Sequence, residues 1–233
     1  MRTIAIMQPY FLPYIGYFQL ISAVDQFVIY DNIKYTKKSW VNRNRFLQND
    51  KDAMFSLPLK RDSDSLDVRE RELAIDFDRK KLLRQLKGAY QGAPNFEQTF
   101  PLIDKIVRYP EQNLFLFLYN GIVQVCGHLG ITTKIRVSSE IAIDHHLQAQ
   151  DKVLALCEAV GATTYMNAIG GVALYSKQVF SQKGIKLVFI KSLPFEYAQY
   201  GGTFVPWLSI VDVMMFNPLP VVQQQIISGH TFV

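Results

Sequence analysis

The sequence predicts one α/β domain of three layers, with a mainly parallel, Rossmann-like sheet across residues 1–233 and a helical insertion at residues 77–129. Three observations lead to this fold class. Residues 1–31 follow the order strand, loop, helix, strand, which is a βαβ unit with parallel strands. The middle of the chain has helical spacing, and strands alternate with helices again after residue 131. Such alternation is typical of a sheet with helices on both faces.

The first half of the chain begins with a short apolar run. Residues 4–7 are all apolar, which favours a strand, and the apolar spacing of residues 14–24 favours a helix. Residues 27–30 are β-branched or aromatic and form the next expected strand. The remaining expectations for this half are a loop at 35–45, two short strands within 46–59 around the polar stretch 48–52, a loop at 61–68 and a strand at 72–75.

The second half begins with the most regular predicted helix, at residues 78–90. Asp76 or Asp78 is its expected N-cap, and its leucines fall on one side. The other predicted elements are helices at 96–107 and 113–129 with Gly130 as a C-terminal cap, strands at 132–137, 163–166 and 185–190, helices at 151–160 and 173–182, and a loop with a short helix within 204–217.

The composition fits a globular protein with a sizeable core, because 49% of the residues are hydrophobic. No apolar run reaches the ~20 residues of a membrane span, and no signal peptide pattern follows Arg2. We therefore predict a cytoplasmic protein without a membrane partner. Cys126 and Cys157 lack metal-ligand spacing, which predicts buried free thiols and no metal site. The net charge of +5 suits an anionic small molecule, a nucleotide or an acidic carrier protein, and it permits nucleic acid.

An aromatic turn follows the first predicted strand, where parallel sheets bind ligands. Gln8 could hydrogen-bond a polar ligand, and Gly16 would let a ligand approach closely. The rings of Tyr10, Tyr14 and Tyr17 could stack on a base or a sugar. An equally open interpretation is that these rings only close the end of the core.

A carboxylate, Asp31, follows the second predicted strand and is placed like a catalytic or ligand-orienting group. The loop after it mixes aromatic, amide and basic side chains, and its arginines could bind a phosphate or carboxylate. A tryptophan among cations also fits a nucleic-acid surface, and a basic surface loop is the simpler alternative. The candidate substrate-binding residues of this loop are Tyr35, Trp40, Asn42, Arg43, Asn44 and Arg45.

Three further stretches are weaker candidates. Ser138 and Ser139 follow a strand, where they could cap a turn or donate to phosphate, and capping is the commoner role. A strand-to-helix junction carries Tyr165, Gly170 and Gly171, and a capped helix near the C-terminus carries Ser209 and Asp212. The adjacent pair His145 and His146 has no carboxylate at metal-ligand spacing and is interpreted as a loop feature.

Together these residues resemble the WbqC-like family nearly end to end. The family's opening motif appears as Gln8-Pro9-Tyr10-Phe11-x-Pro13-Tyr14-x-Gly16-Tyr17-Phe18, and its second as Asp31 to Tyr35 followed by Trp40-x-Asn42-Arg43-Asn44-Arg45. Members often have Ser-Gly after the Tyr165 position, where this chain has Asn167-Ala168. The resemblance implies a bacterial cytosolic protein associated with O-antigen and other surface-polysaccharide biosynthesis.

The resemblance further implies an amide-forming acyl or aminoacyl transferase acting on an amino sugar. The substrate would be a small molecule such as a nucleotide-sugar, and the acyl donor coenzyme A or a carrier-protein thioester. In this interpretation Asp31 accepts the amine proton or orients the amine, Gln8 points into the cleft, and the Trp40–Arg45 loop closes over it. Two alternatives stay open. One is a nucleotide- or nucleic-acid-binding module. The other is a relative of the nucleotidyltransferases, because Tyr14-x-Gly16-Tyr17 stands where that superfamily carries His-x-Gly-His.

Overall fold

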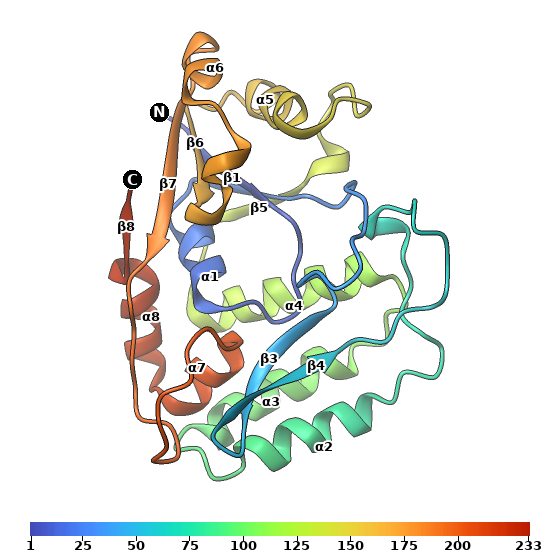
Figure 1. Ribbon diagram of the computed structural model, residues 1–233, viewed down its shortest axis with the longest axis vertical. Coiled ribbons are helices and arrows are strands. Elements are labelled where there is room, and N and C mark those ends of the chain that lie inside the picture. Colours follow the sequence, from blue (N-terminus) through green and yellow to red (C-terminus); the bar gives the residue numbers. More distant parts are fainter.

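The computed structural model describes residues 1–233 and confirms the three-layer, Rossmann-like α/β fold (Figure 1). Its six-stranded sheet has the order β5-β2-β1-β6-β7-β8, in which the first five strands are parallel and β8 is antiparallel to β7. The strands are β1 (Thr3–Met7), β2 (Gln26–Ile29), β5 (Lys134–Val137), β6 (Thr164–Ala168), β7 (Lys186–Ser192) and β8 (His230–Phe232). The chain runs outward from β1 to β2 and β5 and then returns to β6 beside β1, so the order reverses between β1 and β6.

Alternating side chains of the central strands build a core on each face of the sheet. Ala5 and Phe27 point into a core of 47 buried residues that includes α1 (Ile15–Ser22), α4 (Leu114–Leu129) and α8 (Leu219–Ser228). Ile4, Ile6 and Val28 point into the opposite core of 14 buried residues, with α5 (Ala149–Ala159) and α6 (Lys177–Gln182). The sheet therefore lies between two helical layers, as its near-continuous apolar strands require.

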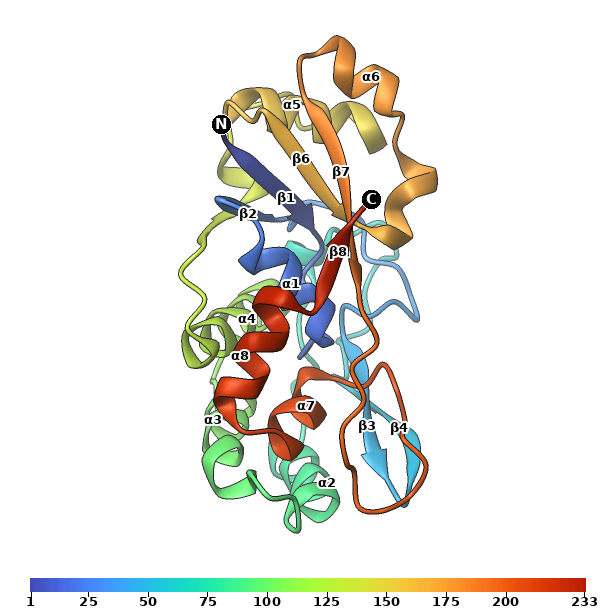
Figure 2. The ribbon, with the colours of Figure 1, turned by 90° about the vertical axis from the view of Figure 1, so that its left-hand side faces the viewer.

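A second region lies below the sheet in both Figure 1 and Figure 2. It contains the hairpin β3 (Arg43–Gln48) and β4 (Lys51–Ser56), with α2 (Arg79–Tyr90), α3 (Phe96–Arg108) and α7 (Ile210–Phe216). Asp78 caps α2 by accepting a hydrogen bond from the amide of Lys81 at 2.8 Å. Helices α2, α3 and α4 occupy the range predicted as a helical insertion, and the assignment of one domain stays a prediction.

Three local expectations differ from the structure. Residues 72–75 form no strand, because Leu73 bridges to Leu59 while Glu72 bridges to Asn113, so no continuous ladder develops. Helix α6 begins only at Lys177, and a 3₁₀ helix over Ile169–Leu174 precedes it. Helix α8 and strand β8 were not expected; proline is tolerated in the first turn of a helix, and Pro220 occupies that position in α8.

No helix of the structure combines the length and the apolar character that crossing a membrane requires.

Both cysteines are free and buried, as predicted, and we expect them to be chemically silent in the folded protein. Burial raises the pKa of Cys126 and of Cys157 to about 12, so the reactive thiolate is scarce near neutral pH. Iodoacetamide at pH 8 is expected to leave the native mass unchanged and to add two carbamidomethyl groups after unfolding in urea, as measured by intact-mass spectrometry. Rapid alkylation of the native protein would contradict this prediction.

Candidate functional site

A small aromatic pocket of about 180 Å³ opens beside the turn that follows β1. Both tryptophans of the chain, Trp40 and Trp207, lie in its walls and are 41% and 60% exposed. The rings of Tyr14 and Trp207 meet edge to face with centroids 6.3 Å apart. The residues that line this aromatic pocket are Tyr10, Pro13, Tyr14, Trp40, Asn44, Arg45 and Trp207.

Asn44 fastens the turn after β1 to strand β3. Its buried side-chain nitrogen donates hydrogen bonds to the carbonyls of Phe11 at 3.1 Å and Leu12 at 2.7 Å. The hydroxyl of Ser209 donates to the same Leu12 carbonyl at 2.6 Å. Leu12 has a φ of +44°, a left-handed conformation that a leucine rarely adopts without such support. Asn44 and Ser209 therefore fix the conformation of the turn that forms one wall of the pocket.

Arg45 supplies the positive charge of the aromatic pocket. Its guanidinium donates to the Trp207 carbonyl at 3.1 Å and lies 3.4 Å from the carboxylate of Asp52. Arg43 and Arg45 project from the same face of β3, and each guanidinium lies 5.6 Å from the centroid of the Trp40 ring. Arg43 also donates to the Lys38 carbonyl. The Asp52 contact is long and exposed, so Arg45 keeps capacity for an anionic ligand.

Gly16 and Tyr17 lie behind the pocket wall. A Cβ atom on Gly16 would stand 2.4 Å from the ring of Tyr14 and 2.5 Å from the hydroxyl of Ser192, so glycine lets the Tyr14 ring pack here. Tyr17 is buried, and its hydroxyl donates to the Gln8 carbonyl at 3.0 Å. Burial raises the pKa of Tyr17 well above its usual value. Direct substrate contact by either residue stays a prediction.

Asp31 follows β2 and therefore lies at the edge of the sheet where the turn after β1 lies. The serines that follow β5 surround it. Asp31 is 2% exposed, and its carboxylate accepts hydrogen bonds from the hydroxyls of Ser138 and Ser139, both at 2.7 Å, and from the Ser139 amide at 3.0 Å. Gln8 follows β1, whose last residue, Met7, pairs with Ile29 of β2. The structure thus places Gln8 and Asp31 on adjacent strand ends.

Asp31, Ser138 and Ser139 form the serine–aspartate cluster, and Asn32, His145 and Lys152 extend it toward α5. The sequence analysis missed Lys152. The buried ammonium of Lys152 donates to the Asn32 carbonyl at 3.1 Å, and the Asn32 amide lies 2.8 Å from Nδ1 of His145. Burial lowers the pKa of Lys152. Nothing in the local sequence marks Lys152, since its partners are 120 residues away along the chain.

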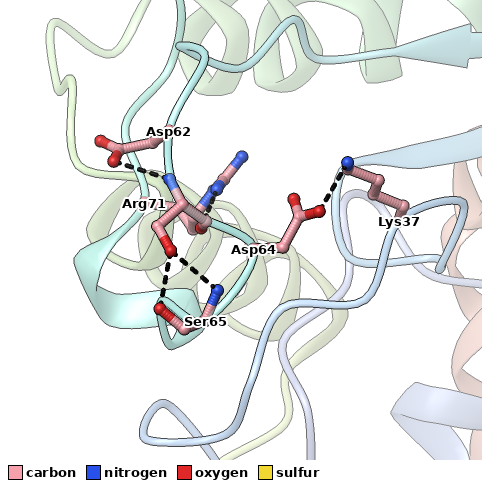
Figure 3. Close-up of polar contacts among 6 residues, drawn as sticks. Lys37, Asp62, Asp64, Ser65 and Arg71 are labelled. Atoms are coloured by element: carbon pink, nitrogen blue, oxygen red, sulfur yellow. Dashed lines mark hydrogen bonds and ion pairs between the residues drawn. The ribbon is translucent and has the colours of Figure 1, made fainter.

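Tyr35 and Asn42 hold the basic loop in place rather than lining the pocket. The Tyr35 hydroxyl donates to Asn42 at 3.0 Å, and the Arg71 guanidinium lies 4.9 Å from the Tyr35 ring. Figure 3 shows a neighbouring attachment, in which Lys37 pairs with Asp64 at 2.8 Å. Arg71 also donates to the Ser63 carbonyl at 2.9 Å. The loop is therefore anchored at one end while Trp40 stays exposed.

The remaining candidates lie outside the aromatic pocket. Tyr165 is fully buried and accepts a hydrogen bond from Asn167 at 2.9 Å, while Gly171 packs against the Asn167 side chain. Gly170 is exposed at the same junction. Asp212 is fully buried in α7. None of these residues shares a wall with Tyr10 or Trp40.

Sequence reasoning missed Trp207 and Pro13 as pocket residues. A usable signal for Trp207 was its rarity: it is one of two tryptophans, and it follows a proline within a segment already marked at Ser209 and Asp212. Pro13 carries no signal beyond its place in the opening motif.

The comparisons with known proteins identify the family of the chain. Residues 8–223 match the sequence model of the WbqC-like protein family. The chain is 29% identical over 222 residues to the uncharacterized protein Rv1507c of Mycobacterium tuberculosis, an alignment that covers 93% of this chain and 94% of that protein. The search of solved structures found no match. Because the family match spans nearly the whole chain, the protein belongs to the WbqC-like family.

Proposed function

We propose that the protein is a cytoplasmic transferase that forms an amide on an amino sugar, by acyl or aminoacyl transfer, in surface-polysaccharide or O-antigen biosynthesis. The observation that carries the proposal is the aromatic pocket with Arg45 in its wall. Aromatic walls with a few polar groups suit a ring-shaped ligand, and the guanidinium suits an attached phosphate or carboxylate. The polysaccharide setting comes from the family resemblance alone.

The size of the pocket supports a partial fit of the substrate. Its volume of about 180 Å³ is below the ~300–1,000 Å³ that is usual for drug-sized ligands. One ring of a nucleotide-sugar would therefore occupy the pocket, with the rest of the molecule lying along the exposed Trp40. The donor, coenzyme A or a carrier-protein thioester, would approach from the open side.

The proposed chemistry places a proton acceptor at the serine–aspartate cluster. The amine nitrogen attacks the thioester carbonyl, a C–N bond forms, the C–S bond breaks and a thiol leaves, so the amine must lose a proton. The Asp31 carboxylate already accepts three hydrogen bonds. Ser139 is less buried than Asp31. We therefore give Ser139 the contact with the amine and Asp31 the role of accepting or orienting the proton through it.

The test is mass-spectrometric detection of an acylated amino sugar, with nucleotide-linked amino sugars as acceptors and acyl or aminoacyl thioesters as donors. Asp31→Asn is expected to lower kcat by ~10²-fold or more and to leave KM nearly unchanged, because general-base groups act in the transition state. Asp25→Asn is the matched control, since Asp25 precedes the same strand at the opposite edge and its carboxylate accepts a hydrogen bond from the Thr3 amide at 2.7 Å. Full activity of Asp31→Asn would refute its role, and no product from any pair would refute the transferase.

A binding module is the second candidate, because Trp40 is exposed and two guanidinium groups lie close to its ring. Such a surface would bind single strands with an affinity that falls steeply with salt. A gel shift with single-stranded oligonucleotides near physiological salt is expected to show no complex, and tight binding there would favour the module. Adenylyl transfer has less support, because the Tyr17 hydroxyl is already bonded to the Gln8 carbonyl and is buried.

A further inference from the structure

A buried carboxylate lies beneath the aromatic pocket and is not explained by ligand contact. Asp212 is fully buried in α7 and accepts hydrogen bonds from the hydroxyl of Tyr90 at 2.9 Å, the hydroxyl of Tyr197 at 2.6 Å and the amide of Gln199 at 2.8 Å. These four residues are called the Asp212 network here. All three donors are neutral, so a carboxylate is held in the protein interior at a solvation cost. Burial raises the pKa of Asp212, and the three hydrogen bonds oppose that rise.

The first arm of the Asp212 network leads to Trp207. Gln199 turns its nitrogen to Asp212, because a carboxylate can only accept. This orientation lets the same nitrogen donate to the Val205 carbonyl at 3.2 Å, while the Gln199 oxygen accepts from the Val205 amide at 2.8 Å. Val205 stands two residues before Trp207. Gln199 therefore joins the Asp212 carboxylate to the Val205 backbone, and this backbone leads into the tryptophan wall.

The second arm leads to Arg45. The Tyr90 hydroxyl donates to Asp212 and accepts from the amide of Leu47 at 3.0 Å. Leu47 stands on β3 two residues after Arg45. The Ser209 amide then donates to the Arg45 carbonyl at 2.9 Å, which closes the connection between α7 and β3. Both charged and aromatic walls of the pocket are thus attached to the same buried carboxylate.

We propose that Asp212 is a positioning residue: it fixes the positions of Trp207 and Arg45 relative to each other in the walls of the aromatic pocket, without touching the ligand. Trp207 needs such support, since its φ of +61° is left-handed and costs ~1 kcal/mol or more unless the surroundings impose it. An effect of this positioning on turnover rests on the function proposed above. The position of Trp207 does not depend on that function, so it can be tested without substrate.

The experiment isolates Trp207 as a fluorescent probe. Trp40→Phe leaves it as the one tryptophan of the chain, and its time-resolved anisotropy reports how firmly the ring is held. Asp212→Asn in this background removes the charge and leaves one acceptor oxygen in place of two, which weakens the hydrogen bonds that hold Gln199 and, through it, Val205. The amplitude of the fast depolarising component is expected to roughly double. Gln199→Met leaves the hydrogen bonds from Tyr90 and Tyr197 to Asp212 and is also expected to increase the fast depolarising component. It provides a second test in case the Asp212→Asn protein does not fold.

Two further variants separate positioning from general loss of stability. Thr99→Val removes a buried hydrogen bond of 3.0 Å to the Met214 carbonyl, on the same helix α7, and is expected to lower Tm by a few degrees without changing the Trp207 signal. In the double variant Asp212→Asn with Gln199→Glu, the asparagine NH2 group can donate to one glutamate oxygen. The other glutamate oxygen can accept from the Val205 amide. This double variant is expected to recover part of the slow anisotropy, which a merely structural role would not predict.

The outcomes distinguish this inference from the proposed function. If Asp212→Asn and Gln199→Met fold and keep the anisotropy of the Trp40→Phe protein, the positioning role is overturned, whether or not the wild-type protein makes an amide. If Trp207 loosens as expected while the wild-type protein makes no amide, the positioning role stands and the transferase is contradicted. If both hold, Asp212→Asn is expected to raise KM by ~10-fold through the displaced wall.

Discussion

Replacing Asn44 by aspartate is expected to lower the free energy of unfolding by about 3 kcal/mol. The Asn44 nitrogen donates to two carbonyls, of Phe11 and Leu12, and is buried. Aspartate has the same shape but no donor, so it would turn a negative charge toward two oxygen acceptors. For a chain of this size the loss corresponds to a drop in Tm of ~6–12 °C. Urea and thermal denaturation measure the change.

The pH dependence gives this prediction a distinctive sign. The introduced carboxyl is buried beside carbonyl oxygens, so its pKa in the folded state is raised above the unfolded value. A group with a raised folded pKa is tolerated below that pKa and becomes destabilising as the pH rises through it. The deficit against the wild-type protein is therefore expected to shrink as the pH falls toward 4.

Asn120→Asp is the matched control, because the Asn120 side chain accepts a hydrogen bond from Gln124 and aspartate can do the same. This variant is expected to change the unfolding free energy by less than ~0.5 kcal/mol. If Asn44→Asp unfolds within that same margin, the turn after β1 is not held by Asn44, and the shape of the pocket must come from elsewhere.

The largest effect on substrate binding is expected from Arg45→Gln. Loss of a charge-assisted hydrogen bond to an anionic group, ~2–3 kcal/mol, would raise KM by roughly 10²-fold. Arg45 contacts the Trp207 carbonyl at 3.1 Å, and glutamine is too short to make the same contact. The Asp212 network still holds the Val205 backbone before Trp207, so the wall is expected to stay in place and kcat to change little. Steady-state kinetics with the acceptor found in the mass-spectrometric assay separate the two parameters.

Arg84→Gln controls for the loss of one positive charge, since Arg84 is exposed on α2 and lies 3.6 Å from Asp78. It is expected to leave KM unchanged. The wild-type KM is expected to rise with ionic strength, and the Arg45→Gln variant should show a weaker salt dependence. An unchanged KM for Arg45→Gln would mean that the guanidinium only supports Trp207. It would contradict the proposal that Arg45 binds an anionic group of the substrate.

Local patterns in the sequence determined the βαβ core and the ends of several helices. The apolar run at 4–7 and the β-branched run at 27–30 are short and bounded by polar or turn residues, and they became β1 and β2. Asp78 caps α2, and Gly130 adopts the left-handed φ of +73° that ends α4. These features depend on neighbours within a few residues, so residue type and spacing suffice to predict them.

Part of the candidate site was also within reach of the sequence. Tyr10 and Tyr14 follow a strand of a parallel sheet, where ligand sites form, and the loop at 35–45 mixes rings with cations. The structure brings Tyr10, Tyr14, Trp40, Asn44 and Arg45 into one pocket. Their roles in binding stay predictions, as does the role of Asp31.

Only the tertiary structure decided which of these groups are exposed and what completes the pocket. Trp207 reaches Arg45 across 162 residues of chain, and Asp31 is covered by serines 107 and 108 residues away. Asp212 belongs to a buried network whose most distant member, Tyr90, is separated from it by 122 residues. Hydrogen bonds between such distant segments follow from strand order and helix packing, and neither periodicity nor local propensity carries that information.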